Sequence, residues 1–146
     1  AIEAANTGHL VFSTVHTTSA SSTVDRVIEV FPSHEQAQIR STLADSIRAI
    51  IAQTLFKRID IRGRIAAMEI LVATPAVRAL VRDAKSHQIP SAIQTGKRYG
   101  MQMLDDAIMD LLNRGKIDPD DAYAKAFEKA RFRPMLRKPP SDFTEA

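Results

Sequence analysis

The chain of 146 residues contains no cysteine. This absence excludes disulfide bonds, a zinc site built on thiolates and a cysteine nucleophile, and it is consistent with a reducing compartment. The chain also lacks any stretch close to the roughly 20 apolar residues that a membrane-spanning helix needs, and no signal-peptide pattern stands at its start. The sequence therefore predicts neither a covalent cross-link nor a transmembrane segment.

The chain has little excess charge, a formal +3 from 20 Lys and Arg against 17 Asp and Glu. Much of that excess lies near the C-terminus, in Lys129, Arg131, Arg133, Arg137 and Lys138. No aromatic residues interleave with a basic face, so nucleic-acid binding has little support. Prolines interrupt the C-terminal segment, and we interpret residues 132–146 as a flexible, solvated basic tail.

The remaining composition, 45% hydrophobic and 25% charged, is that of an ordinary globular protein with room for one core. Near the start, residues 10–12 (Leu-Val-Phe) favour a buried strand of an α/β sheet. Polar side chains then follow at its carboxyl end: Thr14, His16, Thr17 and Thr18. Open α/β sheets place ligands at this end of their strands, so the stretch is a candidate site.

His9 and His16 flank this predicted strand and are seven residues apart. An odd separation along an extended chain puts two side chains on opposite faces, and the span is about 20 Å. The two histidines are therefore poor candidates for one shared metal ion, and we predict no metal site. From the residues alone, a structural and a catalytic histidine are equally good interpretations.

The hydrophobic periodicity predicts a largely helical chain with one hairpin. We expect helices over residues 20–31, 36–55, 74–84, 90–95, 101–112 and 118–130, and a hairpin of residues 55–59 with 64–72. Local capping signals support four of the helix starts, namely Thr18 or Ser19, Ser33 as N-cap with Gln36 reaching back, Thr74 before Pro75, and Asp118 before Pro119.

Several other patterns have plain structural interpretations. Thr95-Gly96-Lys97 lacks the spacing of a phosphate-binding loop. Asp105 and Asp106 are adjacent, so they diverge on a helix and do not form a catalytic pair. Arg78 and Arg82 lie one helical turn apart and project together, which on physical grounds alone favours a solvated face.

Three separated motifs nevertheless resemble one family. Residues 7–17 (Thr-Gly-His-Leu-Val-Phe-Ser-Thr-Val-His-Thr) resemble the histidine box of the type II/IV secretion ATPase superfamily, and of its PilT-type twitching-motility ATPases in particular. Residues 76–83 (Ala-Val-Arg-Ala-Leu-Val-Arg-Asp) resemble the Ala-Ile-Arg-Asn-Leu-Ile-Arg-Glu signature of the retraction ATPases, with Ala79 in place of Asn. Residues 93–96 and 100–105 resemble a C-terminal pattern of the same family, with Met103 where Thr is usual.

The resemblance implies an α/β fold, the C-terminal part of a RecA-like P-loop ATPase domain with a short sheet, followed by a helical subdomain. We expect residues 1–73 to belong to the ATPase core, with its histidine box, long helix and hairpin. Residues 74–131 would form the helical subdomain, and residues 132–146 the tail. The chain starts as if inside a helix, and it shows neither a Walker A phosphate-binding loop nor an acidic Walker B strand. We therefore expect both motifs to lie upstream, and we do not expect this segment to hydrolyse ATP alone.

The resemblance also implies a function, that of a hexameric ATPase that powers type IV pilus retraction with ATP and Mg²⁺. His16, with Thr14, would lie near the terminal phosphate, and His9 would support the same box. Arg78, Arg82 and Asp83 would carry the retraction signature, with Arg78 and Arg82 as the residues that contact neighbouring subunits and the pilus base. The implied partners are five further copies and a pilus platform protein of the inner membrane, with the ATPase peripheral to that membrane in the bacterial cytoplasm.

Two alternatives stay open. One is a secretion or pilus-assembly ATPase of the same superfamily, although those relatives usually carry a four-cysteine zinc insertion. The other is a helical interaction module without catalysis.

Overall fold

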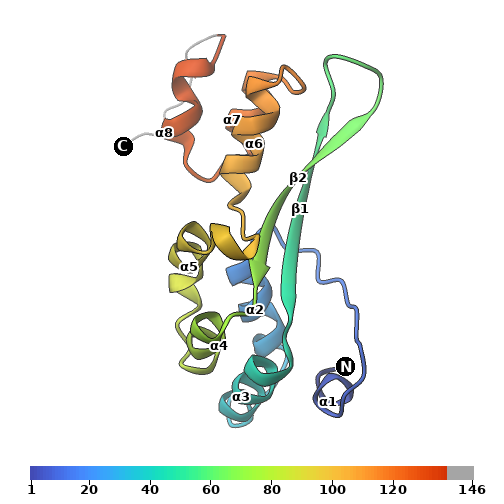
Figure 1. Cartoon of the computed structure of the whole chain (residues 1–146), viewed down its shortest axis with the longest axis vertical. Helices are drawn as coiled ribbons and strands as arrows, with labels where there is room; N and C mark the ends of the chain where they lie inside the picture. Colours follow the sequence, from blue (N-terminus) through green and yellow to red (C-terminus); the bar gives the residue numbers. More distant parts are fainter. Residues whose placement is uncertain (138–146) are drawn as a thin grey trace. The chain divides into compact units, whose positions relative to one another are not determined.

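A computed structural model describes residues 1–137 of the chain (Figure 1). Its helices and strands are, in order, α1 (Ile2–Asn6), α2 (Ala20–Glu29), α3 (Gln36–Ser46), β1 (Ala49–Lys57), β2 (Arg64–Val72), α4 (Pro75–Arg82), α5 (Ile89–Thr95), α6 (Leu104–Asn113), α7 (Pro119–Lys125) and α8 (Lys129–Phe132). Short 3-10 turns are η1 (Ser86–Gln88), η2 (Lys97–Tyr99) and η3 (Arg133–Met135). The predicted mixture of helices with a short sheet is confirmed.

The chain forms two compact units. Unit 1 comprises residues 1–52 and 68–103, and unit 2 comprises residues 53–67 and those from 104 onward. Each strand of the hairpin contributes residues to both units. These borders differ from those of the three segments expected from the sequence, which remain a prediction.

β1 and β2 pair as the expected hairpin, closed where the Arg58 N–H donates to the Gly63 carbonyl at 3.0 Å. The predicted long helix over residues 36–55 is wrong, however, because α3 ends at Ser46 and β1 begins at Ala49. The apolar residues 50, 51 and 55 fit a helical stripe and a strand alike, and pairing with β2 decides between them. The capping box predicted from Ser33 to Gln36 is also wrong, because Glu35 precedes α3 without a side-chain cap and Gln36 Nε2 donates to the Phe31 carbonyl at 3.0 Å.

The predicted buried strand at residues 10–12 is also wrong. The segment after α1 forms no strand, and the side chains of Leu10 and Phe12 are 80% and 88% exposed. A strand needs a neighbour for its backbone N–H and C=O groups, and none of the described residues offers one here.

Unit 1 has one core, to which α2, α3, α4, α5 and the end of β2 contribute buried side chains (Figure 1). The core side chains include Val24, Ile28, Leu71, Val77, Val81, Ile89 and Ile93, all essentially buried. α4 starts as predicted, since the Thr74 hydroxyl accepts the Val77 N–H at 3.4 Å and Pro75 occupies the first turn. The N-terminal helix α1 packs against α3.

Unit 2 has its own core of Phe56, Ala67, Leu104, Ile108, Leu111, Ile117, Ala122, Ala126 and Phe132. The single last helix predicted over residues 118–130 is wrong, because α7 ends at Lys125 and α8 follows separately. The buried carboxylate of Asp105 accepts the N–H groups of Phe127 and Glu128 at 2.9 and 2.8 Å. These bonds to a partner 22 and 23 residues away replace helical ones and hold the break between α7 and α8.

The basic residues near the C-terminus bind within unit 2. Lys129 Nζ donates to the carbonyls of Tyr123 and Ala124 at 2.7 Å each, and Arg131 pairs with Asp106 at 2.7 Å. Regular structure continues past the predicted start of the tail, since Phe132 is fully buried and η3 follows it. The remainder of the predicted tail, residues 138–146 with Lys138, lies outside the described residues.

Candidate functional site

The candidate site lies where the segment after α1 enters α2. His16 has a backbone φ of +53°, in the left-handed region that a residue with a side chain adopts only when its surroundings enforce it. Three residues later, Ser19 caps α2 as predicted, because its Oγ accepts the Ser22 N–H at 3.2 Å. The sharp entry into α2 therefore fixes the direction in which residues 16–18 present their side chains.

A second residue holds the start of α2. Glu69, in the middle of β2, is only 4% exposed, and its Oε1 accepts the N–H of Ala20 at 2.8 Å. This contact joins residues 49 positions apart in the sequence, so no local pattern could have revealed it.

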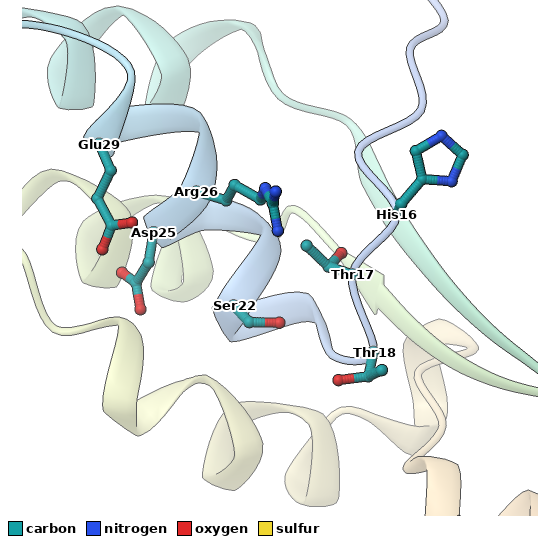
Figure 2. A pocket seen from close by; sticks show the side chains of 7 residues that line it. All are labelled: His16, Thr17, Thr18, Ser22, Asp25, Arg26 and Glu29. Carbon is teal, nitrogen blue, oxygen red and sulfur yellow. The ribbon is translucent and has the colours of Figure 1, made fainter.

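An open hollow of about 470 Å³ lies against this entry (Figure 2). Its lining comes from the approach segment and from the polar face of α2: His16, Thr17, Thr18, Ser22, Asp25, Arg26 and Glu29. The α2 residues at 22, 25, 26 and 29 follow helical spacing opposite the buried face of the same helix. The amphipathic pattern of α2 thus places a polar stripe beside His16.

The hollow combines groups suited to a phosphate with groups that repel one. Figure 2 shows Arg26 extending toward Thr17, with the His16 ring turned outward from the segment. A guanidinium offers a planar pair of N–H donors that matches phosphate oxygens, and hydroxyls add further donors. The carboxylates of Asp25 and Glu29 line the same hollow, and Asp25 accepts the Ser86 hydroxyl at 2.7 Å.

The hydroxyls of Thr17 and Thr23 bond to each other, which ties the approach segment to the first turns of α2. Thr23 Oγ1 also lies 2.8 Å from the carbonyl of Ser19. These contacts, together with the Ser19 cap, account for the fixed backbone at the edge of the hollow.

The structure brings together only part of the predicted site. His16 lines the hollow, whereas Thr14 and His9 do not belong to its lining. The exposed His9 ring lies beside the end of α1, with Nδ1 3.2 Å from the Ala4 carbonyl and 3.3 Å from Thr7 Oγ1. The roles proposed for all three residues stay predictions.

Sequence reasoning missed three charged residues of the hollow, Asp25, Arg26 and Glu29. Their signal was present, because a polar stripe at helical spacing directly follows the histidine. The apolar face of the same helix carries a stronger pattern, which obscures this polar stripe.

The signature residues of α4 are engaged within unit 1. Arg78 donates from Nη1 to the carbonyls of Ala44 and Asp45 at 2.6 and 2.7 Å, and from Nε to Ala73 at 3.1 Å. Arg82 forms a more exposed ion pair with the Asp45 carboxylate at 2.8 Å. Arg78 therefore caps the free carbonyls at the end of α3.

Within residues 1–137, no three acidic or histidine side chains converge in the manner of a metal site. The helices described here also include none long and apolar enough to cross a bilayer.

Comparison with known proteins gives one family. Residues 1–62 match the model of the family described as "Type II/IV secretion system protein". The chain is 52% identical over 126 residues to the type IV pilus retraction ATPase PilT of Pseudomonas aeruginosa, covering 86% of this chain and 36% of that protein. It is 49% identical over 126 residues to the twitching motility protein of Neisseria gonorrhoeae, covering 86% of this chain and 34% of the relative.

A solved structure described as the pilus retraction motor PilT with bound ADP matches the fold with a TM-score of 0.78 and 34% sequence identity. This match covers 89% of the chain and 36% of the PilT chain. The chain thus spans about a third of the length of the relatives that it matches. On sequence and fold alike, it belongs to the type II/IV secretion ATPase superfamily and resembles the PilT-type twitching-motility ATPases.

Proposed function

We propose that this chain is the C-terminal part of a hexameric ATPase that powers type IV pilus retraction by hydrolysing ATP. The observation that carries the proposal is the hollow beside His16, where Arg26 and threonine hydroxyls meet at a constrained backbone. It lies in the stretch that matches the family model, and a relative of the same fold is described with bound ADP.

Within this proposal, His16 faces the terminal phosphate of ATP. A neutral imidazole donates one hydrogen bond and accepts another, so it responds to whether that phosphate is present. Arg26 adds a fixed positive charge with paired donors. Thr14 and His9 keep their proposed supporting roles in the histidine box, outside the hollow itself.

Phosphoryl transfer needs further parts, namely a backbone cradle with a lysine, a carboxylate that orients water, and Mg²⁺ to neutralise phosphate charge. The described residues contain no cluster that fits Mg²⁺, so we derive no step through the metal. We assign these parts to the two thirds of the relatives' length that this chain does not span.

The exposed apolar residues 10–12 support the same assignment. An extended apolar segment with free backbone groups is suited to pairing within a larger sheet. We propose that Leu10 and Phe12 are buried there in the whole ATPase, as the resemblance implies for the histidine box.

The proposed partners are five further copies and a pilus platform protein at the cytoplasmic face of the bacterial inner membrane. The Arg78 guanidinium donates its hydrogen bonds to backbone carbonyls of unit 1, whereas Arg82 and Asp83 are exposed at the end of α4. We therefore assign direct contact with a partner to Arg82 and Asp83, and a supporting role to Arg78.

The test uses the full-length parent protein. We expect Mg²⁺-dependent ATP hydrolysis by a hexamer in solution, and loss of twitching motility when the gene is deleted. Hydrolysis combined with loss of secretion and normal twitching would favour the secretion ATPase alternative. A full-length protein that assembles but hydrolyses no ATP would favour the interaction module and overturn the proposal.

A further inference from the structure

Among residues 1–137, Glu69 and Asp105 are the buried charged side chains. Burying a carboxylate costs free energy unless hydrogen bonds compensate for the lost water. Asp105 has a clear structural task, because it holds the break between α7 and α8. Glu69 instead reaches from β2 to a single backbone N–H, that of Ala20, at the first turn of α2.

Ala20 stands four residues after His16 and two after Thr18. The segment from residue 16 to residue 20 begins with the left-handed φ of His16 and ends at the N–H of Ala20. The hydrogen bond from this N–H to Glu69 therefore restrains the C-terminal end of that segment. Such a conformation persists only where surrounding contacts enforce it. The Thr17–Thr23 pair and the Ser19 cap supply such contacts from within the segment and α2, and Glu69 adds one from β2.

The position of Glu69 is itself secured by residue 102. On either side of Glu69, Gln102 binds β2: its backbone exchanges hydrogen bonds with Ile70 at 2.9 and 3.0 Å, and its Nε2 donates to the Met68 carbonyl at 2.7 Å. A chain of contacts thus leads from Gln102 through Glu69 to Ala20, all within unit 1.

The carboxylate also determines where an anion can bind. The N-terminus of a helix ordinarily attracts phosphate through its free N–H groups and its dipole. In α2 the first N–H is already taken by Glu69, whose charge would repel a phosphate there. A phosphate in the hollow is thereby directed away from the helix end and toward the side chains of Thr17 and Arg26.

We propose that Glu69 is a positioning residue. By holding the N–H of Ala20, it fixes residues 16–18 in the conformation that presents His16 to the terminal phosphate. This inference rests on the proposed function, since the phosphate is that of ATP.

The test compares variants of the full-length parent protein by steady-state ATP hydrolysis. Glu69→Ala should lower kcat by about 10- to 100-fold, the usual effect of a misplaced catalytic group, with the KM for ATP changed less than about threefold. Glu69→Gln keeps an oxygen that accepts the Ala20 N–H, so its kcat should stay within about threefold of the wild type. A purely structural role would not separate kcat from KM in this way.

Asp105→Asn is the matched control, because it alters an equally buried capping carboxylate in unit 2. It should lower the melting temperature without changing kcat per assembled hexamer. A kcat for Glu69→Ala equal to that of the wild type would overturn the inference. A Glu69→Gln variant with a kcat as low as that of Glu69→Ala would also overturn the inference. If Glu69→Ala fails to assemble, the kcat of Glu69→Gln decides the outcome.

A second readout does not depend on activity. Amide hydrogen exchange over residues 16–20 should become at least about tenfold faster in Glu69→Ala and stay near the wild-type rate in Glu69→Gln. Unchanged exchange in Glu69→Ala would overturn the inference even in an active enzyme. A wild type without turnover would instead overturn the proposed function, while this measurement would still decide the role of Glu69.

Discussion

Single charged residues in this chain are held by close partners, and Asp60 is the clearest case. Arg58 donates to its carboxylate from Nε and Nη2 at 2.8 and 2.6 Å, and Lys116 Nζ donates at 2.8 Å. Hydrogen bonds from Arg58, and then from Lys116, hold the pKa of Asp60 well below its usual range. The carboxylate thus ties the hairpin turn to the end of α6 within unit 2.

A group whose pKa is lowered by folding stabilises the protein above its unfolded pKa, about 4, and this contribution is lost as the pH falls toward the folded pKa. We predict that Asp60→Asn lowers the melting temperature at pH 7 by a few degrees. The difference from the wild type should shrink between pH 4 and pH 2. Melting curves across this range check the prediction, with Asp110→Asn as a control that removes one exposed ion pair. A difference that grows on acidification would contradict it.

At the scale of elements, side chains from distant sequence positions hydrogen-bond the backbone groups at the ends of helices. Arg78 of α4 caps the carbonyls at the end of α3, and Asp105 of α6 binds the N–H groups between α7 and α8. Each contact satisfies backbone groups that the helix itself leaves without partners. The end of α3 and the start of α8 thus depend on residues far along the chain.

Arg78→Ala should destabilise the protein by about 2 kcal/mol, because it leaves three carbonyls without their charged donor. Arg82→Ala should cost less than about 0.5 kcal/mol, since its ion pair with Asp45 is largely exposed. Urea denaturation measures the free energy of unfolding of both variants. Equal destabilisation by the two variants would contradict the capping role.

In the full-length protein we also predict that Arg78→Ala leaves ATP hydrolysis intact and stops retraction.

Asp105→Ala should release α8 from the end of α7. Two partly buried N–H groups would lose their charged acceptor, at a cost of about 2 kcal/mol. Hydrogen exchange should accelerate over residues 127–132, and much less in Asp106→Ala, which removes a surface ion pair with Arg131. Equal protection of α8 in Asp105→Ala and the wild type would show that this carboxylate does not hold the break.

The sequence predicted most of the elements whose signals are local, although the capping box expected at Ser33 does not form. Ser19, Thr74 with Pro75, and Asp118 with Pro119 start helices as expected, because each cap acts within its own first turn. The end of α3 could not be located, since the apolar residues that follow fit both periods. The break after α7 depends on Asp105, which lies 22 residues away in the chain.

The same distinction holds for the candidate site. His16 was found from a local sequence pattern, whereas Glu69 acts across 49 residues and leaves no trace in spacing. Arg26 had a local signal on the polar face of α2 that the apolar face outweighed. Arg78 was expected on a solvated face or in a partner contact, and only the structure shows its bonds to α3.

At the scale of the whole molecule, exposed apolar surface shows what the chain leaves unburied. Leu10 and Phe12 stand in an extended segment without a neighbouring strand. Large apolar side chains gathered on one segment mark a surface that another part of a protein covers. We assign that cover to the sheet of the whole ATPase.

Phe12→Ala should therefore act differently in two settings. In the isolated 146-residue chain it should hardly change the melting temperature, because the ring is 88% exposed. In the full-length parent it should cost about 3–5 kcal/mol, as expected for a buried ring. Ser13→Ala is the control from the same segment and should be nearly neutral in both. A small cost for Phe12→Ala in the full-length protein would mean that the segment is not buried there.

The central claim is that His16 acts on a phosphate that other parts of the ATPase bind. Steady-state ATP turnover of the full-length protein with His16→Ala tests it most directly, with the exposed His34→Ala as the matched control. Turnover should be abolished in His16→Ala and unchanged in His34→Ala, with both variants assembling as hexamers. Wild-type turnover in an assembled His16→Ala variant would contradict the account.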